Sequence, residues 1–388
     1  MLQAFSQSHR LLNTAAYPRD ELLKKKHESY FCPECKEEVI LKVGHKNIPH
    51  FAHKKTSTCI LHQGESKYHE QGKYQLYQWL QKNKIPTELE VYFPETRQRA
   101  DIIFNFKQRK WALEYQCSSL PMSVWKQRTQ SYRELGILPF WILGGNRLKM
   151  VKEGVLRLDE LDYHAIHLNQ ARQPQLIYYC SSSQRFAQFS HLYPSSASEV
   201  HGFLSYIKLE NAQFTQLFKQ ETFPYSMLLN NWQKQKENRR LIPINENNKE
   251  IRNWKKFLYA HGISPLLIPS SIDLPVPHQW RIKIPPFLWQ TYLYVSLIMM
   301  KSPGTLITLS MAKAILRSFF PMEEKILYSI TNHDPFHSYL EGLCYLNILS
   351  PVQEECYMIQ KIEAPPRGIE EALHRDQEFL ALLLEKWQ

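Results

Sequence analysis

The spacing of apolar residues changes several times along residues 65–143, and each change predicts a different element. Leu76, Trp79 and Leu80 recur near helical spacing, whereas the runs that follow are short and rich in β-branched and aromatic side chains, as strands are. Polar, proline-containing or glycine-containing segments separate these runs. The pattern predicts the order helix, strand, strand, strand, helix, strand over residues 65–83, 88–93, 98–106, 110–118, 121–135 and 137–143. This order indicates an α/β layer in which helices flank a mixed sheet.

Beyond residue 150 the pattern is less regular. Residues 155–220 predict mixed short strands and helices, and a proline-rich passage at 265–286 predicts a boundary between domains. A helix predicted at 336–346, followed by a strand-like run at 355–362, has the outline of a winged helix, although many helical domains end in this way. We divide the chain into residues 1–62, residues 63–220, and a mainly helical part at 221–388.

The composition indicates a folded and basic protein. The chain has 388 residues, of which 43% are hydrophobic and 13% aromatic, a composition that suffices for packed cores and argues against wholesale disorder. The formal net charge of +11 favours an anionic partner, with nucleic acid first and a membrane surface second. The longest apolar stretch, residues 287–300, is too short to cross a bilayer, and the first residues lack the pattern of a secretion signal. Seven cysteines, an odd number, fit reduced thiols better than a disulfide framework, so we expect a cytoplasmic protein without membrane insertion.

The N-terminal part of the chain contains candidate zinc ligands. Cys32 and Cys35 have the CxxC spacing of a zinc knuckle, and His50, His53 and Cys59 follow. Two thiolates and two later nitrogen or sulfur donors satisfy tetrahedral Zn²⁺. We predict structural zinc on Cys32, Cys35, His53 and Cys59, with His50 as a substitute. The alternative is a metal-free β-module.

Two of the predicted strands carry an acid where an apolar residue would ordinarily lie. These acids are Asp101 and Glu114, and a hairpin of the two strands brings them next to each other. Two such carboxylates predict a site for Mg²⁺ or Mn²⁺. Gln116 shares a strand face with Glu114, whereas Leu113 and Tyr115 lie on the other face. The pattern suggests a metal-dependent phosphodiesterase that acts on nucleic acid.

The flanking helices add further polar residues. Glu65, His69 and Lys73 are spaced four residues apart, so they share one face of the predicted helix. They could supply a metal ligand and a phosphate contact, or form a solvated polar face. On the next helix Arg128 and Tyr132 lie one turn apart, where they could bind a phosphate, buttress the carboxylates, or lie on the surface.

These parts, in this order, resemble the PD-(D/E)XK nuclease superfamily, in which a core helix carries an acid, the second strand an Asp, and the third strand an ExK or ExQ motif. Residues 25–145 are also similar to the competence protein CoiA family. The similarity rests on Cys-Pro-x-Cys, His-Phe-Ala-His, Glu65-Ser66-x-x-His69, Arg99-Ala100-Asp101-Ile102, Glu114-Tyr115-Gln116-Cys117-Ser118, Arg128-x-x-x-Tyr132 and Trp141-Ile142-Leu143. The resemblance implies an α/β fold: a restriction-endonuclease-like mixed sheet core, an N-terminal zinc-ribbon-like module, and a mainly α-helical C-terminal domain.

The resemblance also implies a cytoplasmic role in natural transformation, on incoming single-stranded DNA or on branched recombination intermediates, with recombination proteins as candidate partners. It implies catalytic roles for Asp101, Glu114, Gln116, Glu65 and His69, and DNA contacts by Lys73, Arg99, Arg128 and Tyr132. One position departs from the superfamily pattern, because Gln116 replaces the motif lysine. Glutamine supplies no positive charge, so hydrolysis would be slower or depend more on the metal.

Two functions therefore compete. The first is a Mg²⁺-dependent DNA nuclease, and the second is a non-catalytic DNA-binding recombination factor that keeps the nuclease fold as a platform. The second is favoured by the net charge, by the zinc-ribbon candidate and by the basic segment 232–240. Trp232 in this segment and the later Trp254 are candidates for stacking on single-stranded DNA. Tyr115 and Trp141 are expected in the core instead.

Overall fold

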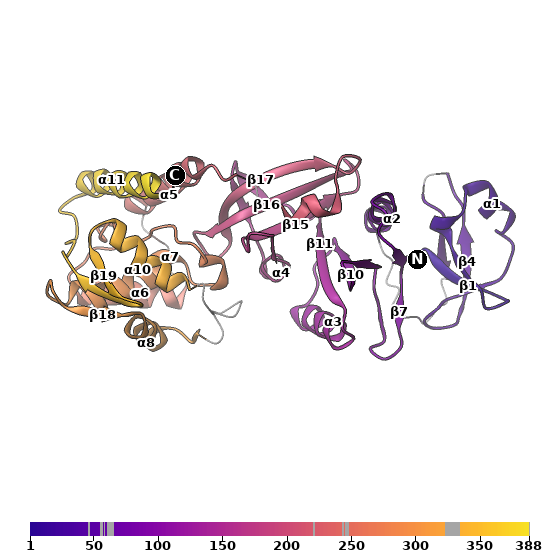
Figure 1. The fold of residues 1–388 in the computed structure, drawn as a ribbon, viewed down its shortest axis with the longest axis horizontal. Coiled ribbons are helices and arrows are strands. Elements are labelled where there is room, and N and C mark those ends of the chain that lie inside the picture. Colours follow the sequence, from indigo (N-terminus) through magenta and orange to yellow (C-terminus); the bar gives the residue numbers. More distant parts are fainter. Residues whose placement is uncertain are drawn as a thin grey trace. The chain divides into compact units, whose positions relative to one another are not determined.

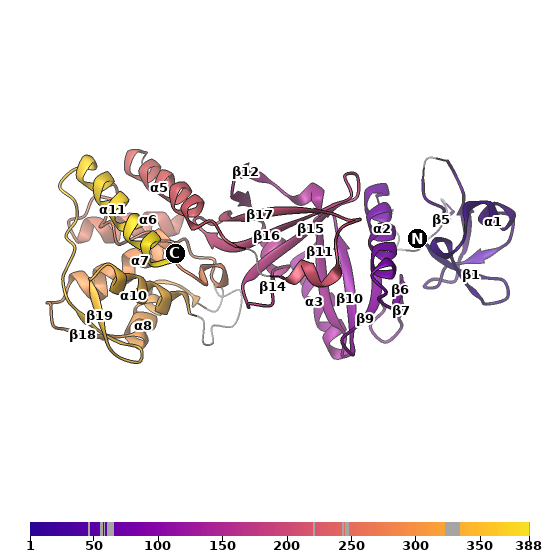
Figure 2. The same cartoon turned by 45° about the horizontal axis from the view of Figure 1, so that its top comes forward.

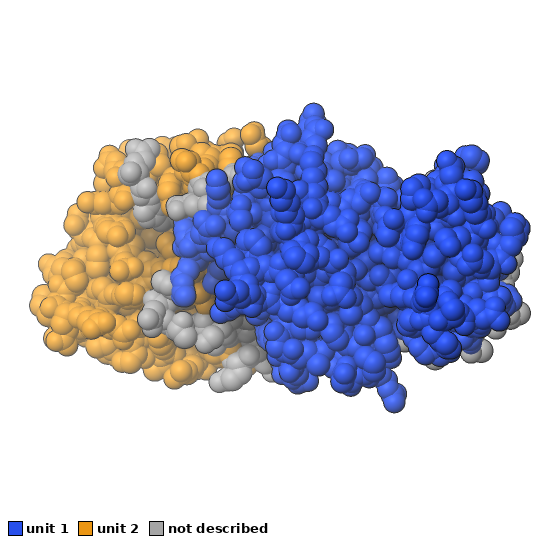
Figure 3. All heavy atoms as spheres, turned by 45° about the vertical axis from the view of Figure 1, so that its right-hand side comes forward, with its two compact units in different colours: residues 1–149, 160–189, 204–220 blue, residues 150–159, 190–203, 221–388 orange. Residues whose placement is uncertain are grey.

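The computed structural model describes residues 1–388 except for 46, 55–56, 58, 60–65, 220–221, 243, 245–247, 323–333 and 388 (Figure 1). The chain forms two compact units, which Figure 3 shows in different colours. Unit 1 consists of residues 1–149, 160–189 and 204–220, and unit 2 of residues 150–159, 190–203 and 221–388. None of the helices described has the length and apolar character that a membrane-crossing helix needs.

The N-terminal module of unit 1, which here means its described residues up to Cys59, is built on an antiparallel five-stranded sheet in the order β2-β1-β3-β4-β5. Strand β4 alternates exposed and buried residues, because only one of its faces lies on the core. On that face Val39 and Leu41 pack with Tyr30 and Phe51. The elements are β1 (Gln3–Ser6), β2 (Leu11–Asn13), α1 (Arg19–Lys24), β3 (Tyr30–Phe31), β4 (Glu38–Lys42) and β5 (His50–His53).

The centre of unit 1 is a mixed sheet in the order β6-β9-β10-β11-β15, with β14 also paired to β15. Strands β9 and β10 form an antiparallel hairpin, while β10, β11 and β15 run parallel. Lys107 and Gln108 connect the two strands with φ of 47° and 59°, the left-handed geometry of a two-residue loop, so the predicted hairpin is present. The elements are α2 (Lys67–Lys82), β6 (Thr87–Leu89), β9 (Ile102–Phe106), β10 (Arg109–Gln116), α3 (Met122–Glu134), β11 (Leu138–Gly144), α4 (Glu160–His164), β14 (His167–Leu168) and β15 (Pro174–Cys180).

The two long helices of unit 1 cover opposite faces of this sheet (Figure 2). Leu76 and Leu80 of α2 pack with Leu113 of β10, whereas Tyr132 of α3 packs with Ala112 on the other face. Neighbouring residues of a strand point to opposite faces, so β10 contributes side chains to the core on both faces of the sheet. The predicted mixed α/β layer with flanking helices is confirmed.

Two of the predicted strands are interrupted. The run at 88–93 divides into β6 and β7 (Tyr92–Phe93), and the run at 98–106 divides into β8 (Gln98–Arg99) and β9. Strands β7 and β8 pair with each other in a separate two-stranded sheet. The break lies where Glu90 adopts a φ of 51° and its N–H donates to the carbonyl of Asp101 at 2.8 Å. The pairing of residues 88–93 with residues 98–106 is therefore interrupted directly beside the predicted catalytic acid.

The later strands are longer than predicted. Instead of short pieces at 155–220, β15 is followed by β16 (Arg185–Pro194) and β17 (Glu199–Lys208), each 10 residues long. Buried polar residues such as Gln188 and Ser190 conceal the strand pattern in the sequence. Both strands contribute residues to unit 1 and to unit 2. Short strands β12 (Met150–Lys152) and β13 (Val155–Arg157) belong to unit 2.

Unit 2 is mainly helical and has one large apolar core. The predicted helix and the strand-like run near its end are present as α10 and β20, and two further strands complete a sheet in the order β18-β20-β19. The winged-helix assignment stays a prediction. The elements are α5 (Tyr225–Leu241), α6 (Lys249–Ala260), α7 (Pro286–Tyr294), β18 (Leu306–Thr308), α8 (Leu309–Phe319), α10 (Pro335–Tyr345), β19 (Leu349–Gln353), β20 (Cys356–Ile359) and α11 (Ile369–Trp387).

Two expectations for unit 2 were wrong. The proline-rich passage is part of the core rather than a boundary, since Ile272 and Leu274 are at most 1% exposed. Trp232 and Trp254, the candidates for base stacking, are each only 1% exposed. The indole N–H of Trp232 donates to the carbonyl of Asp273 at 2.8 Å, so this ring is fixed inside the protein. Segment 232–240 is therefore not an exposed aromatic platform.

Candidate functional site

The β9–β10 hairpin brings the two predicted acids together. Ile102 pairs with Leu113, and continuing the antiparallel register by one residue places Asp101 opposite Glu114. The N–H of Tyr115 donates to Oδ2 of Asp101 at 3.0 Å, which fixes the carboxylate at this point. Leu113 and Tyr115 belong to the core beneath α2, so the predicted division of strand faces is confirmed.

Both acids line one polar cavity of about 350 Å³. Its walls come from the N-terminal module, α2, the β8–β9 segment, β10 and α3. The lining residues are Glu34, His69, Thr96, Arg97, Gln98, Arg99, Asp101, Glu114, Gln116, Val124, Gln127 and Arg128. The cavity therefore gathers three acids and three arginines around the end of the hairpin.

Glu114 is held from α3 by two donors. Nη2 of Arg128 donates to its Oε2 at 2.6 Å, and the hydroxyl of Tyr132 donates to its Oε1. Burial raises the pKa of Glu114 despite the adjacent Arg128, and the nearby Asp101 carboxylate raises it further. Both carboxylate oxygens are thus bonded to protein groups, while the side chain still faces the cavity.

These contacts decide between the roles left open for α3. Tyr132 is 0% exposed and bonded to Glu114, so it buttresses the carboxylate, and its predicted contact with DNA is corrected. Arg128 also buttresses Glu114, but its side chain is 30% exposed and lines the cavity, which leaves it accessible to a phosphate. Its Nη2 donates in addition to the carbonyl of Arg99 at 3.1 Å.

Asp101 receives two further contacts from α2. Nε2 of His69 lies 3.3 Å from Oδ2 of Asp101, and Nζ of Lys73 lies 3.8 Å from Oδ1. Lys73 is 0% exposed and donates to Oε1 of Glu90 at 2.5 Å. The predicted phosphate contact by Lys73 is therefore corrected, because its ammonium group points into the protein. Its charge instead compensates Glu90 and Asp101.

Gln116 and Glu65 complete the predicted catalytic set. The Gln116 amide donates to the carbonyl of Ser118 at 2.9 Å, and the side chain lines the cavity beside Glu114. Glu65 lies outside the described residues. The positive charge that the motif lysine would supply is thus absent from position 116, whereas Lys73 brings one toward Asp101 from the helix.

Glu34 is a site residue that the sequence did not reveal. It lies between the two cysteines of the knuckle and yet lines the same cavity as Asp101. Its Oε1 lies 3.3 Å from Nε of Arg99, and the side chains of Glu34 and Arg99 are only 4% and 13% exposed. An acid at a variable position of a CxxC motif carries no signal of a partner 65 residues away, so only the folded chain identifies it.

The zinc ligands predicted from spacing are gathered in the N-terminal module. The donor atoms of Cys32, Cys35, His53 and Cys59 all lie within 4.8 Å of one another, and Sγ of Cys35 lies 3.3 Å from Nε2 of His53. Three thiols and one imidazole at these separations are the donor set of a structural zinc site. Within the described part of the chain, His50 is not in this group, and its Nδ1 lies 2.9 Å from the carbonyl of Ile48.

The chemistry of the cavity suits a hard divalent cation only in part. Carboxylate oxygens such as those of Asp101 and Glu114 are the ligands that Mg²⁺ and Mn²⁺ prefer. The Arg128 guanidinium, however, already lies where it neutralises Glu114. A cation that binds here would have to share Glu114 with this arginine.

Comparison with known proteins finds three family domains that match successive regions of the chain. Residues 14–62 match the N-terminal domain of competence protein CoiA, residues 65–222 its nuclease-like domain, and residues 228–373 its C-terminal domain. The chain is also 28% identical over 360 residues to competence protein CoiA of Bacillus subtilis (strain 168), covering 91% of this chain and 96% of that protein. No solved structure matches the chain.

Proposed function

The chain belongs to the competence protein CoiA family, and on this premise we propose that it is a divalent-metal-dependent nuclease that processes DNA in natural transformation. The proposal places it in the cytoplasm, acting on incoming single-stranded DNA or on branched recombination intermediates beside recombination proteins. It keeps the three-part division at 1–62, 63–220 and 221–388, with structural zinc in the first part.

The observation that carries the proposal is that Asp101 and Glu114, from paired strands, line one cavity with Arg99 and Arg128. The two carboxylates would hold Mg²⁺ or Mn²⁺. When bound, such a cation activates a water molecule and neutralises charge on the phosphate. The arginines would bind the phosphate oxygens, since guanidinium groups match their geometry.

The remaining cavity residues have supporting roles in this proposal. The amide of Gln116, fixed by its bond to Ser118, would orient the water without supplying a charge. His69 lies against Asp101 and stacks on the ring of Tyr115 at a centroid separation of 5.6 Å, so it would hold the Asp101 carboxylate in place. The net charge of +11 would draw DNA to the protein and make binding weaken as salt increases.

The test is cleavage of end-labelled single-stranded, duplex and branched DNA with Mg²⁺ or Mn²⁺. We would compare the wild type with Asp101→Asn, Glu114→Gln and, as a matched control, Glu88→Gln, an exposed acid on the neighbouring strand β6. Loss of a residue behind a metal ligand costs about 10–100-fold, so loss of a ligand should slow cleavage by about 100-fold or more. Cleavage by Asp101→Asn at the wild-type rate would refute the proposal.

A second function, a non-catalytic DNA-binding factor, is favoured by one specific feature. Arg128 and Tyr132 occupy both oxygens of Glu114, and Gln116 brings no charge, so the site also fits a stable platform without turnover. This alternative would be supported if the wild type binds DNA in a salt-dependent manner but neither binds Mn²⁺ at Asp101 nor cleaves any of the three substrates.

A further inference from the structure

The N-terminal module reaches into the acidic cavity through its zinc knuckle. Glu34 lies between Cys32 and Cys35, two members of the zinc-type donor group. Its carboxylate lies 3.3 Å from Nε of Arg99, two residues before Asp101. A surface ion pair of this kind contributes little, but here the Glu34 side chain is only 4% exposed, so the pair is shielded from water.

The same module also contacts Glu90, whose partner Lys73 lies near Asp101. The backbone N–H groups of Leu2 and Gln3 donate to Oε2 of Glu90 at 2.7 and 3.2 Å. Oε1 of Glu90 accepts from Lys73 at 2.5 Å, and the Lys73 ammonium lies 3.8 Å from Asp101. One chain of polar contacts therefore leads from the N-terminal module to Asp101, and the Glu34–Arg99 pair of the same module lines the same cavity.

The position of Arg99 matters because a guanidinium pairs with any accessible carboxylate. Arg99, Asp101 and Glu114 line one cavity, and Glu114 is already paired with one arginine. If Arg99 turned toward Asp101 or Glu114, it would occupy the ligands that a divalent cation needs. The contact with Glu34 directs Arg99 toward the knuckle instead.

We propose that the Cys/His module is a working part of the acidic site, in which Glu34 is a positioning residue that holds Arg99 away from Asp101 and Glu114. Zinc on the Cys/His cluster fixes the knuckle and with it Glu34, so the zinc site sets the affinity of the second, divalent-cation site. This inference rests on the proposed function, because it assumes that Asp101 and Glu114 bind Mg²⁺ or Mn²⁺.

The experiment is titration of the zinc-loaded full chain with Mn²⁺, followed by calorimetry or by electron paramagnetic resonance of free Mn²⁺. We expect Glu34→Gln to weaken Mn²⁺ binding by about tenfold, since the released guanidinium competes for the carboxylates. Glu34→Asp keeps the charge but is one methylene shorter, so it should weaken binding by about threefold. Adding Arg99→Gln to either variant should restore the affinity, because the competing group is gone.

The matched control is Glu38→Gln, an exposed acid of the same module that pairs with Lys54. It should bind Mn²⁺ like the wild type. Unchanged affinity in Glu34→Gln would mean that Glu34 does not hold Arg99 away from the two carboxylates, and failure of Arg99→Gln to restore binding would mean that the pair merely supports the fold. Either result would overturn the inference.

A zinc-site variant tests the link between the two metals. Cys35→Ser should weaken Mn²⁺ binding as Glu34→Gln does, and Arg99→Gln should again restore it; an unaffected Cys35→Ser protein that lacks zinc would overturn the link. If circular dichroism shows that Cys35→Ser does not fold, the Glu34 variants still decide the role of Arg99.

The wild type and Asp101→Asn separate failure of the proposed function from failure of this inference. If the wild type shows no Mn²⁺ binding that is lost in Asp101→Asn, the proposed function and the inference both fail. If the wild type shows such binding and the Glu34 variants bind Mn²⁺ equally well, only the inference is refuted.

Discussion

Each unit of the molecule contains a cluster of buried charged side chains. The two clusters differ in how completely ion pairs and hydrogen bonds within the protein compensate these charges. In unit 2, Arg240 donates to both oxygens of Asp376 at 3.0 and 2.9 Å, and Lys236 lies 3.1 Å from the same carboxylate. Lys236 also donates to the carbonyls of Ser270 and Ile272 at 2.7 and 2.9 Å. All three charged side chains are at most 3% exposed.

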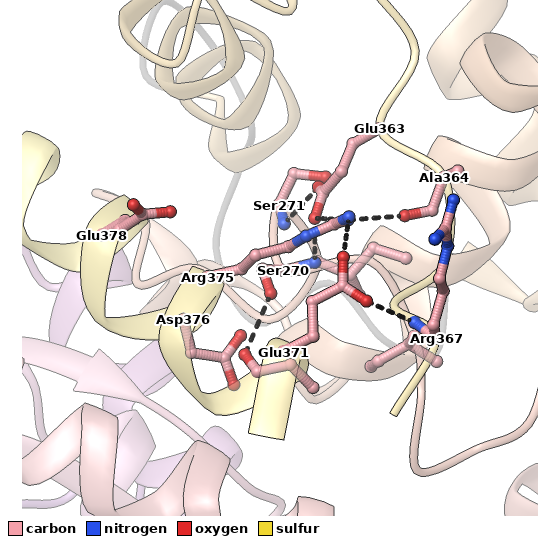
Figure 4. Close-up of polar contacts among 12 residues, drawn as sticks. Ser270, Ser271, Glu363, Ala364, Arg367, Glu371, Arg375, Asp376 and Glu378 are labelled. Carbon is pink, nitrogen blue, oxygen red and sulfur yellow. Dashed lines mark hydrogen bonds and ion pairs between the residues drawn. The ribbon is translucent and has the colours of Figure 1, made fainter. Parts of the chain in front are cut away.

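Further hydrogen bonds satisfy the charged side chains next to this cluster. The carboxylate of Glu363 accepts from the N–H groups of Ser270 and Ser271 at 2.7 and 2.9 Å, and Arg375 donates to the carbonyl of Ala364 at 2.9 Å (Figure 4). Burial alone would raise the pKa of Asp376, but Lys236 and Arg240 lower it, so the carboxylate stays ionised. These charges join helices α5 and α11 to the connecting segments of unit 2 and serve its structure.

The cluster in unit 1 is different because it is open. Burial raises the pKa of Glu114, so its ionised form is less completely compensated than that of Asp376. Arg128 is 30% exposed, and the acids face a cavity of about 350 Å³. Buried charge alone therefore does not mark a functional site, whereas incompletely compensated charge at a cavity is a better sign.

The largest expected effect separates the two clusters by stability. Asp376→Asn leaves Lys236 and Arg240 buried beside a neutral partner, and breaking a buried ion pair in this way costs about 3–5 kcal/mol. We expect this loss in the free energy of unfolding of unit 2, measured by denaturant titration, with unchanged Mn²⁺ binding. Glu378→Gln, an exposed acid on the same helix, is the control. A loss below about 1 kcal/mol would show that the cluster in unit 2 is not structural.

The second effect concerns the open cluster. Tyr132→Phe removes the hydroxyl that bonds to Glu114, and a hydrogen bond to a charged group contributes about 1.5–3 kcal/mol. The free energy of unfolding of unit 1 should fall by this amount, while Mn²⁺ affinity should rise because one oxygen of Glu114 becomes available. Phe93, whose ring packs edge-on against Tyr132, offers a control as Phe93→Leu, which should reduce stability without raising the affinity. Weaker Mn²⁺ binding in Tyr132→Phe would contradict the view that Tyr132 competes with a cation.

The third effect is a pH dependence outside the site. His201 in unit 2 is 1% exposed, and burial lowers its pKa to about 4, with Lys152 and Arg239 acting in the same direction. In the unfolded state His201 has an ordinary histidine pKa near 6.5. Between about pH 6.5 and 4 it is therefore protonated in the unfolded state but neutral in the folded state. This group should therefore reduce stability by about 1.4 kcal/mol for each unit that the pH falls through that range. His201→Gln should remove this slope and the exposed His374→Gln should not, as denaturant titrations at several pH values would reveal.

The sequence predicted those parts of the site that depend on local pattern. The hairpin that joins Asp101 to Glu114, the two helices and the four donors of the Cys/His cluster follow from spacing within short segments. The turn residues and the alternation of faces along a strand fix such relations without knowledge of the rest of the fold.

The sequence did not predict relations that depend on distant partners. Lys73 looked like a surface cation because its partner Glu90 lies at a bend that the strand pattern did not reveal. Segment 232–240 looked like a basic DNA-binding face because the acid that pairs with Lys236 and Arg240, Asp376, lies 136 residues after Arg240. A sequence gives the sign of each charged side chain. It does not show which of them the fold buries beside an opposite charge.

The smallest expected effect uses the hairpin turn to identify the unfolding transition of unit 1. Gln108 adopts a φ of 59°. This left-handed conformation raises the free energy of a residue that has a Cβ atom by about 1 kcal/mol, but it does not do so for glycine. Gln108→Gly should therefore raise the stability of unit 1 by about 0.5–1 kcal/mol, despite the greater freedom of glycine in the unfolded chain. In a calorimetric scan, the transition that Tyr132→Phe lowers should move upward, and the transition that Asp376→Asn lowers should stay in place.

Gln130→Gly, in the middle of α3, is the opposite control, and it should reduce the stability of unit 1 by about 1 kcal/mol. If Gln108→Gly shifted both transitions together, the two units would unfold as one, and the open and closed clusters could not be compared through separate stabilities.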